Sequence, residues 1–282
     1  MKFLVRVLNK LGLLKYVNLT IQHQQGTNGK RINVPIIQSF GRENLYLSEL
    51  WMGQLIEKLF VLKSGIFIDV GVNVGQTLIK LKSRFPEAVY IGFEPNPACV
   101  FYAKELVRHN EFKDTLIVPV GLAEKNELLS LYFYADGDLD SSASIIENFR
   151  PEKVYRKEFV PCFDFKSIGF VLGNKQVSII KIDVEGAELA VLKSLDELIA
   201  KERPFILIEV LPVYSLDNKP RMERQQAIES MLKELNYAIL RVNKKSEQLS
   251  GFEKLNEFGL TKEVALSDYV FCPIEELANV LR

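Results

Sequence analysis

The sequence predicts an α/β protein in which helices cover both faces of a mostly parallel sheet. Segments 66–70, 88–93 and 177–182 are rich in Ile, Val and Phe, which is typical of strands that are buried on both faces. Each segment ends at a turn that contains Gly or Pro, and a stretch with helical periodicity follows. The chain has 282 residues, of which 48% are hydrophobic, so it can bury one substantial core.

Residues 1–62 predict an extension ahead of the main domain, which we place at 63–282. Residues 1–15 predict an amphipathic helix, because basic residues spaced by four alternate with apolar ones. A helix of this kind docks on the body of the protein, on a second copy in a homodimer, or peripherally on a membrane surface, and the first two are favoured. A β-hairpin is expected over 16–38, with its turn at 26–29.

The elements after the hairpin follow from runs of apolar residues, their periodicity and the Gly and Pro residues between them. In order they are helix 43–62, strand 66–70, helix 74–84, strand 88–93, helix 97–110, strands 115–120, 128–134 and 158–163, helix 164–172, strand 177–182, helix 186–201, strand 205–210, helix 221–235, and strands 237–242 and 267–272. The last two strands lack a helical crossover of usual length, which predicts an antiparallel edge.

The loop after the first buried strand indicates a nucleotide-type cofactor that lacks a diphosphate. A dinucleotide-binding loop has glycine at its first, third and sixth positions, whereas this loop has Gly71, Asn73 and Gln76 there. Gly71 and Gly75 remove side chains where backbone is expected to approach the ligand. Asp69, two residues earlier, suits a cationic or hydroxyl-bearing ligand. S-adenosyl-L-methionine, with a sulfonium and an ammonium group, meets these demands.

The next strand ends in Glu94-Pro95-Asn96-Pro97, which places a carboxylate 23 residues after Gly71. An acid at this position accepts hydrogen bonds from the ribose hydroxyls of a nucleotide cofactor. Asn96 is a further candidate for cofactor contact, although Pro-Asn-Pro is equally a turn signature.

A third motif follows the strand at 177–182 and reads Lys181-Ile182-Asp183-Val184-Glu185-Gly186-Ala187-Glu188. Together with the loop after Asp69 and the Glu94 turn, it resembles the FkbM family of S-adenosylmethionine-dependent methyltransferases. The resemblance covers residues 65–212 well and the first 60 residues loosely. It implies a Rossmann-like class I methyltransferase fold, with a mostly parallel seven-stranded sheet and an antiparallel edge strand. It also implies O-methylation of a glycan, a polysaccharide precursor or a natural product.

Open α/β sheets bind ligands beyond the carboxyl ends of their strands, so the candidate site residues are expected on one rim. The cofactor-binding candidates are Asp69, Gly71, Asn73, Gly75, Glu94, Asn96, Gly121 and Leu122. Asp69 is expected to face the methionine ammonium, through water if necessary, and Gly121 and Leu122 to lie near the adenine. The catalytic candidates are Asp183, Glu185 and Glu209.

The acceptor hydroxyl sets the chemical demand on the catalytic acids. An isolated carboxylate, whose conjugate acid has a pKa of about 4, is an inefficient base for such a weak acid. Crowding among Asp183, Glu185, Glu188 and Glu209 would raise their pKa values. Alternatively, Asp183 and Glu209 would share a divalent cation that acidifies the hydroxyl. The metal-free version is favoured, because the sequence offers no third ligand. Glu185 and Glu188 would also complement the dipole of the helix at 186–201.

Two other functions remain open at this point. Asp136-Gly137-Asp138 follows a strand, as in metal-dependent glycosyltransferases that hold a nucleotide-sugar, although a solvated turn is the simpler interpretation. A methyltransferase-like subunit without catalysis is the other alternative. For the favoured function, the acceptor pocket is expected between segments 135–157 and 211–222, with Tyr214 stacking on a sugar ring.

Composition limits the partners and the compartment. The formal net charge is zero, so no global field would recruit nucleic acid. Cys99, Cys162 and Cys272 lack paired or metal-ligand spacing, which indicates free thiols in a reducing compartment and hence a cytoplasmic protein. No uninterrupted run of 18 apolar residues occurs, so no transmembrane segment is expected.

Overall fold

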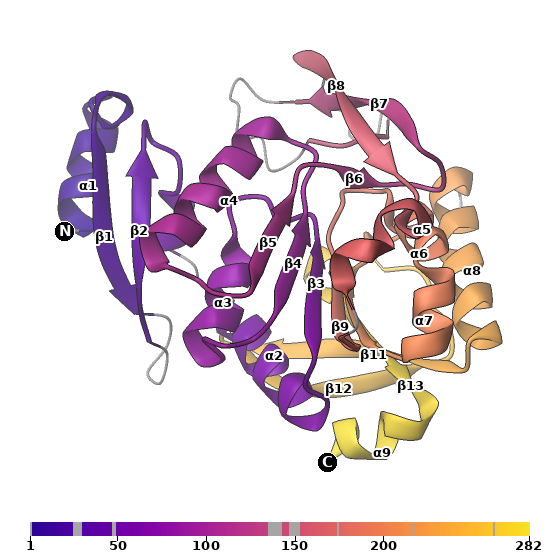
Figure 1. Ribbon diagram of the computed structural model, residues 1–282. Coiled ribbons are helices and arrows are strands. Elements are labelled where there is room, and N and C mark those ends of the chain that lie inside the picture. Colours follow the sequence, from indigo (N-terminus) through magenta and orange to yellow (C-terminus); the bar gives the residue numbers. More distant parts are fainter. Residues whose placement is uncertain are drawn as a thin grey trace.

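The fold of the chain is described by a computed structural model that covers residues 2–24, 30–46, 49–134, 143–146, 153–173, 175–215, 217–261 and 263–282. Within these residues, the main sheet has eight strands in the order β12-β11-β13-β10-β9-β3-β4-β5 (Figure 1). Its parallel core consists of β3 (Ile66–Val70), β4 (Tyr90–Phe93), β5 (Thr115–Val118), β9 (Val177–Ile182) and β10 (Phe205–Glu209). The predicted α/β class with a mostly parallel sheet is confirmed.

The register of the parallel strands brings the predicted site residues to one edge of the sheet. Val70 pairs with both Phe93 of β4 and Ile182 of β9, so the residues that follow these strands start at the same height. Glu209 ends β10, one strand further along. The four loops therefore converge beyond the carboxyl ends of the strands, as the sequence predicted.

The antiparallel end of the sheet differs from the prediction in its details. Strand β13 (Asp268–Pro273) is antiparallel to its neighbours and lies between β10 and β11 (Tyr237–Lys245), inside the sheet. The outermost strand on this side is β12 (Gln248–Leu255), which forms a hairpin with β11 and raises the predicted seven strands to eight. Strand β12 is absent from the prediction because it is largely polar and half exposed. It therefore lacks the apolar run that is typical of a buried strand.

A separate three-stranded sheet has the order β6-β8-β7. The predicted strand at 115–120 is β5 of the main sheet, which ends at Val118, and the short β6 (Gly121–Leu122) of this second sheet follows it. Strands β7 (Glu127–Phe133) and β8 (Arg156–Phe163) are antiparallel to each other, and β6 pairs with β8. Leu122, in β6, therefore lies next to the main sheet while it belongs to the second one.

Helices cover both faces of the main sheet (Figure 1). On one face lie α2 (Leu50–Leu62), α3 (Gln76–Arg84), α4 (Pro97–Asn110) and α9 (Leu277–Leu281); on the other lie α5 (Phe165–Ile168), α6 (Glu188–Ser194), α7 (Asp196–Glu202) and α8 (Lys219–Glu234). The predicted helix at 186–201 is two helices that meet at Leu195, and the one at 43–62 is a 3₁₀ turn (Glu43–Leu45) followed by α2. The helix predicted at 164–172 is α5 followed by a 3₁₀ turn (Gly169–Leu172).

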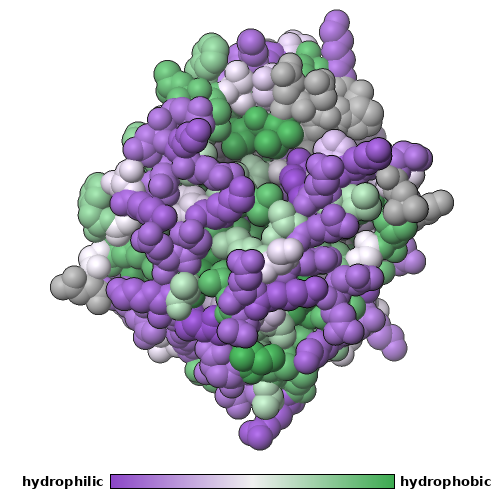
Figure 2. Space-filling view, turned by 90° about the vertical axis from the view of Figure 1, so that its right-hand side faces the viewer, coloured by the Kyte–Doolittle hydropathy of each residue, from purple (hydrophilic) through white to green (hydrophobic). Residues whose placement is uncertain are grey.

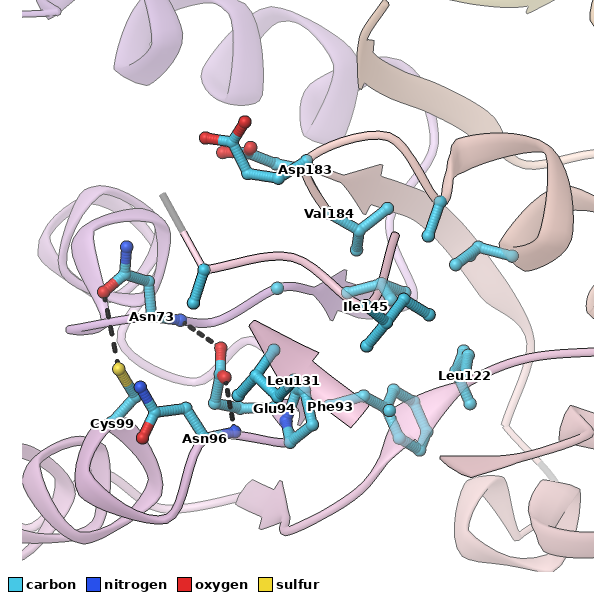
Figure 3. Close-up of a pocket in the computed structure, with 18 of the residues that line it drawn as sticks. Asn73, Phe93, Glu94, Asn96, Cys99, Leu122, Leu131, Ile145, Asp183 and Val184 are labelled. Atoms are coloured by element: carbon cyan, nitrogen blue, oxygen red, sulfur yellow. Dashed lines mark hydrogen bonds between the residues drawn. The ribbon is translucent and has the colours of Figure 1, made fainter. Parts of the chain in front are cut away.

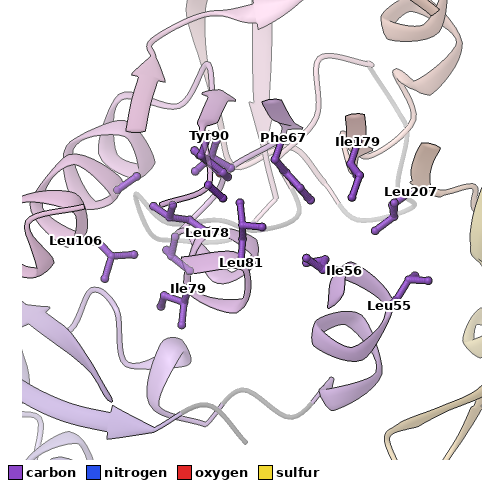
Figure 4. Close-up of a cluster of buried hydrophobic side chains, with 14 of the residues drawn as sticks. Leu55, Ile56, Phe67, Leu78, Ile79, Leu81, Tyr90, Leu106, Ile179 and Leu207 are labelled. Atoms are coloured by element: carbon purple, nitrogen blue, oxygen red, sulfur yellow. The ribbon is translucent and has the colours of Figure 1, made fainter. Parts of the chain in front are cut away.

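Alternation along the strands divides the core into two layers. Phe67, Ile179 and Leu207 point toward α2 and α3 and pack with Ile56 and Leu81 (Figure 4). The intervening residues of the same strands pack against α6, α7 and α8. Both faces of the central strands are thus dry, which explains their continuous runs of Ile, Val and Phe. Hydrophilic residues dominate the outer surface on the side of α7 and α8 (Figure 2).

The extension ahead of the sheet contains α1 (Lys2–Lys10), a 3₁₀ turn (Leu14–Tyr16), and the hairpin of β1 (Asn18–Gln24) and β2 (Arg31–Ile37). The hairpin is confirmed, and its predicted turn at 26–29 lies outside the described residues. Strand β2 packs on α4, and Val34 and Ile36 belong to the same buried cluster as the α2–α3 layer. The division of the chain at residue 62 stays a prediction. No helix in the described ranges combines the length and the hydropathy needed to cross a bilayer.

Two reciprocal hydrogen bonds attach the hairpin to α4. The backbone N–H of Asn33 donates to Asn110 Oδ1 (2.7 Å), and Asn110 Nδ2 donates to the carbonyl oxygen of Asn33 (2.7 Å). Replacing Asn110 with Ala leaves both backbone groups of Asn33 without this partner, so we expect a loss of about 1–3 kcal/mol in the free energy of unfolding. Urea denaturation measures this loss. Asn279→Ala removes only an exposed side-chain bond to Glu276 and is the control; equal losses in the two variants would contradict this attachment.

Candidate active site

A cavity of about 310 Å³ lies beyond the carboxyl ends of β3, β4 and β9, between the main sheet and the three-stranded sheet (Figure 3). Its apolar lining comes from both sheets and from the segment 143–146, and consists of Val70, Phe93, Leu122, Leu131, Ala143, Ile145, Val184, Ala187 and Val191. Carboxylates stand at both of its ends. Glu94 lies at one end, and Asp183, Glu185 and Glu209 lie at the other. Most of the candidate residues named from the sequence therefore line one cavity.

Backbone conformation and close packing within the protein require the two glycines of the loop after β3. Gly71 has φ +88°, and a Cβ added there would lie 1.9 Å from the carbonyl oxygen of Asp183. Gly75 has φ +75°, and its Cβ would lie 2.7 Å from a methyl group of Leu106. Gly71 lines the cavity, whereas Gly75 does not. The sequence analysis attributed both glycines to a close ligand; the positive φ angles and the neighbouring atoms require glycine even without one.

Glu94 is held from both sides by backbone N–H groups (Figure 3). Its Oε2 accepts a hydrogen bond from Asn73 N (2.7 Å) and its Oε1 accepts one from Asn96 N (2.8 Å). The side chain is 6% exposed, and burial raises its pKa to about 7, against the opposing effect of the two N–H groups. The carboxyl group is thus fixed in position with its remaining lone pairs available at the cavity.

The other candidates at this end have local structural roles as well. Asn96 caps α4, since its Oδ1 accepts a hydrogen bond from Ala98 N (3.0 Å), which matches the turn signature. Asn73 has φ +49°, and its Oδ1 accepts from Cys99 Sγ (3.6 Å). Gly121 and Leu122 line the cavity from β6. All three cysteines are buried, and none of them forms a disulfide bond within the part of the chain that the structure describes.

Asp69 does not line the cavity, because it lies fully buried beneath the loop. Its Oδ2 accepts a hydrogen bond from Tyr90 OH (2.5 Å), and its Oδ1 is 3.3 Å from Lys181 Nζ. The expected contact with the methionine ammonium has no direct path in this arrangement. The contacts that Asp69 makes give it a different role, which is to hold Lys181.

Lys181 connects the loop after β3 with the catalytic candidate after β9. Its Nζ is 3.2 Å from Asp183 Oδ2 and donates a hydrogen bond to the carbonyl oxygen of Gly71 (3.1 Å). Burial works to lower the pKa of Lys181, but the ion pairs with Asp183 and Asp69 outweigh it and raise the pKa above its ordinary value. The ammonium therefore stays charged and fixes the position of Asp183. The pairing with Asp183 is predictable from the sequence, because residues two apart on a strand point to the same face, whereas the contacts with Asp69 and Gly71 depend on the neighbouring strand.

Glu209 lines the cavity together with Asp183 and has a raised pKa. Burial, followed by the charges of Asp183 and Asp268, raises its pKa to about 8, and Ser267 Oγ donates a hydrogen bond to its Oε1 (3.0 Å). The idea that crowded carboxylates raise one another's pKa thus fits Glu209. Glu188 lines neither cavity, and its Oε1 accepts a hydrogen bond from Gly186 N (2.8 Å) at the start of α6. Burial raises the pKa of Glu188, and the charge of Asp183 adds to this effect.

Ser144 holds segment 143–146 in place at the cavity, a role that the sequence did not indicate. Ser144 forms a β-bridge with Tyr132, and its Oγ donates a hydrogen bond to the carbonyl oxygen of Glu185 (2.6 Å). Ala143 and Ile145, on either side, line the cavity. Only tertiary contacts identify this serine, so the sequence carried no signal for it.

A second cavity of about 270 Å³ adjoins the first and shares Gly71, Asn73, Gln76, Asp183 and Glu209 with it. Its other walls are the start of α2, α3 and the segment 264–268. They are polar and include Lys80, whose side chain is 3% exposed and whose Nζ is 2.7 Å from Glu49 Oε2. Asp268, also in the wall, pairs with Lys244.

Of the two walls predicted for an acceptor pocket, segment 135–157 contributes Ala143 and Ile145 to the first cavity, whereas segment 211–222 lies elsewhere. No described residue of segment 211–222 lines either cavity, and Tyr214 is partly exposed with the guanidinium of Arg221 near its ring (5.6 Å). Asp136, Asp138, Ser141 and Ser142 lie outside the described residues. Among the residues that are described, no group of three or more His, Cys, Asp or Glu side chains is arranged to hold a metal ion.

Residues 69–239 match the methyltransferase FkbM domain, which is more than half of the chain. The chain belongs to the FkbM methyltransferase family. Two fungal relatives are 26% identical to it, each over 46% of this chain: methyltransferase 1 of Beauveria bassiana and methyltransferase sdnD of Sordaria araneosa. The aligned regions span 58% and 60% of these relatives. An FkbM methyltransferase structure from Methylobacillus flagellatus has a TM-score of 0.46 and 15% identity, and covers 74% of this chain and 43% of that one.

The cavity suits the cofactor of this family, S-adenosyl-L-methionine. The carboxyl group of Glu94 can accept hydrogen bonds from ribose hydroxyls, and the apolar residues around Leu122 and Ile145 can contact an adenine. The acids at the opposite end favour the positive charges of the methionine portion. The glycosyltransferase alternative rests on Asp136 and Asp138, outside the described residues, and the family assignment does not favour it.

Lys181 provides a test of how this site is held together. Lys181→Met leaves Asp69 as a buried, unpaired charge, so we expect a loss of about 3–5 kcal/mol in the free energy of unfolding. The double variant with Asp69→Asn should recover part of that loss, since the buried charge is then absent. Urea denaturation measures both. Lys193→Met, which removes only the exposed pair with Glu124, should cost at most about 1 kcal/mol; a similar small loss for Lys181→Met would contradict this role.

Proposed function

We propose that this protein is an S-adenosyl-L-methionine-dependent O-methyltransferase that methylates a hydroxyl group of a glycan, a polysaccharide precursor or a natural product. The observation that carries the proposal is the position of Glu209. It is a largely buried carboxyl group with an elevated pKa, and it lies where the cofactor-sized cavity meets the second, polar cavity. A base for a hydroxyl acceptor is needed at such a junction.

In the first cavity, residues from four loops would hold the cofactor. Glu94 would accept hydrogen bonds from the ribose, while Leu122 and Ile145 would contact the adenine. Asn73 and Gly71 would lie beneath the methionine portion, and Glu185 would add negative charge near it. The bound cofactor supplies a methyl group that is activated by its attachment to a sulfonium sulfur. The protein then has to orient an acceptor and remove its proton.

The second cavity is suited to the acceptor. It borders the first at Gly71, Asn73 and Asp183, and its walls alternate carboxylates with ammonium groups that can bind hydroxyls. Glu209, in its carboxylate form, would accept the hydroxyl proton as the acceptor oxygen bonds to the methyl carbon. Asp183, fixed by Lys181, would orient the hydroxyl, and its charge contributes to the high proton affinity of Glu209.

Titration with S-adenosylhomocysteine tests the role of Glu94. Glu94→Ala should raise the dissociation constant about tenfold or more, because hydrogen bonds to a charged carboxylate are lost. Since the pKa of Glu94 lies at about 7 in the free protein, its carboxylate fraction falls as the pH decreases. Binding by the unaltered protein should therefore weaken from pH 8 to pH 6, and Glu94→Gln should remove this dependence. Calorimetry measures both, with a nucleotide-sugar as the competing ligand; binding of the nucleotide-sugar alone would overturn the assignment.

The pH dependence of turnover tests the base. Release of S-adenosylhomocysteine with an acceptor found by screening hydroxyl compounds should rise with pH and level off above about 8, where Glu209 is ionised. Glu209→Gln should lower kcat about 100-fold or more, and Asp183→Asn should lower kcat while sparing cofactor binding. Glu197→Gln changes an exposed acid in α7 and is the control. Unchanged turnover in Asp183→Asn would show that its proposed role is wrong.

A further inference from the structure

The zero net charge of the chain conceals a strong separation of charge along the sequence. Seven of the 36 Lys and Arg residues lie within residues 2–42, whereas none of the 36 Asp and Glu residues lies there. The first acidic residue is Glu43. The formal net charge of residues 2–42 is therefore +7, and that of the rest of the chain is −7. Arg42 forms an ion pair with Glu43 (3.1 Å), and the other six positive charges would attract an anionic partner.

The same segment exposes large apolar side chains. Phe3 is 79% exposed, Leu11 is 64% exposed and Tyr16 is 73% exposed, and Leu4 and Leu13 are about half exposed. Helix α1 and strand β1 lie at the margin of the molecule opposite α8 (Figure 1). Val5 is the buried residue of α1, so its side of the helix faces the rest of the protein. The apolar residues that remain exposed thus point away from the core.

The geometry of α1 places these two kinds of residue side by side. Successive residues of an α-helix turn by about 100°, so side chains spaced by four form a stripe. Phe3 and Val7 form one stripe, which Leu11 continues just after the helix end, and Lys2, Arg6 and Lys10 form the next one. Lys15 and Tyr16 continue the surface beyond the helix. We call the exposed residues Phe3, Leu4, Lys10, Leu11, Leu13, Lys15 and Tyr16 the N-terminal patch.

We propose that the N-terminal patch docks on the surface of an anionic lipid bilayer. Apolar side chains beside lysines are the pattern of helices that lie in a membrane interface, with the apolar groups among the acyl chains and the ammonium groups at the lipid phosphates. The snorkelling of Lys10 and Lys15 would let both contacts form together. This inference is independent of the proposed methyl transfer.

Charge also argues against the other occupants of this surface. A second copy docked symmetrically would bring two segments of seven positive charges together, which is unfavourable. Lys2 already experiences such repulsion: burial and then the charge of Arg6 lower its pKa. A nucleic acid would neutralise the lysines but leave Phe3 and Leu11 exposed. An anionic bilayer satisfies both kinds of side chain.

Vesicle flotation of the full chain tests the proposal. The protein should float with phosphatidylcholine vesicles that contain about one third phosphatidylglycerol, but not with phosphatidylcholine alone, and high salt should weaken binding. Each basic residue near such a surface strengthens binding about fivefold. Lys10→Glu with Lys15→Glu should therefore weaken binding at least tenfold, and Phe3→Ser with Leu11→Ser should weaken it to a similar extent.

Matched variants elsewhere on the surface serve as controls. Phe159 and Phe170 are 69% and 81% exposed, and Lys104 and Lys201 are exposed lysines of α4 and α7. Changing the first pair to Ser, or the second pair to Glu, should leave flotation unchanged. Circular dichroism and urea denaturation verify that every variant is folded.

Three results would overturn the proposal. One is the absence of flotation with the anionic vesicles. The second is equal flotation of the patch variants and the controls. The third is sedimentation of the unaltered protein as a dimer that Phe3→Ser with Leu11→Ser dissociates, since the patch would then bind a second copy.

Discussion

The ammonium group of Lys181 connects the loops that form the candidate site. It extends from β9 to Asp69 of the neighbouring strand β3, to the carbonyl of Gly71 in the following loop, and to Asp183 at the end of its own strand. A charge in the interior of a protein is tolerated only when it is paired and hydrogen-bonded, so the three groups are bound into one arrangement. The loop after β3 and Asp183, which line both cavities, therefore have a fixed position relative to each other.

A second constraint reinforces the first at the same place. Gly71 approaches the carbonyl of Asp183 so closely that no side chain fits between them. The backbone after β3 and the backbone after β9 thus touch directly, with the ammonium of Lys181 beside the contact. Glu94 is held in a comparable way by one N–H group of its own loop and one of the loop after β3. Hydrogen bonds and close packing, and not flexible side chains alone, determine the shape of the cavity.

The local motifs were the part of the site that sequence could predict. A buried strand, a glycine and a carboxylate lie within a few residues of one another, and parallel strands bring such loops to one edge. Most of the predicted residues consequently line one cavity. The interpretation of individual residues was less accurate where a distant partner decides it. Asp69 faces Lys181 and Tyr90, and Gly75 faces Leu106, and none of these contacts is visible in the pattern around them.

Features that depend entirely on tertiary structure could not be predicted. Strand β12 is too polar to resemble a strand, and only its pairing with β11 makes it one. The second cavity is formed by α2, α3 and a segment some 200 residues later, and Lys80 in its wall resembles an ordinary exposed lysine of an amphipathic helix. The break at Leu195 between α6 and α7 could not be predicted either, because no Gly or Pro occurs there.

The shared position of Glu209 couples the occupants of the two cavities. A cationic ligand in the first cavity stabilises the ionised form of Glu209, whereas a neutral ligand of the same shape does not. The methylated cofactor carries a positive sulfur and the demethylated product carries a neutral one. In the proposed reaction, Glu209 would therefore be drawn toward its proton-accepting form while the methylated cofactor is bound, and toward its protonated form once the methyl group has been transferred. The charge state of Glu209 would thus follow the charge on the cofactor sulfur.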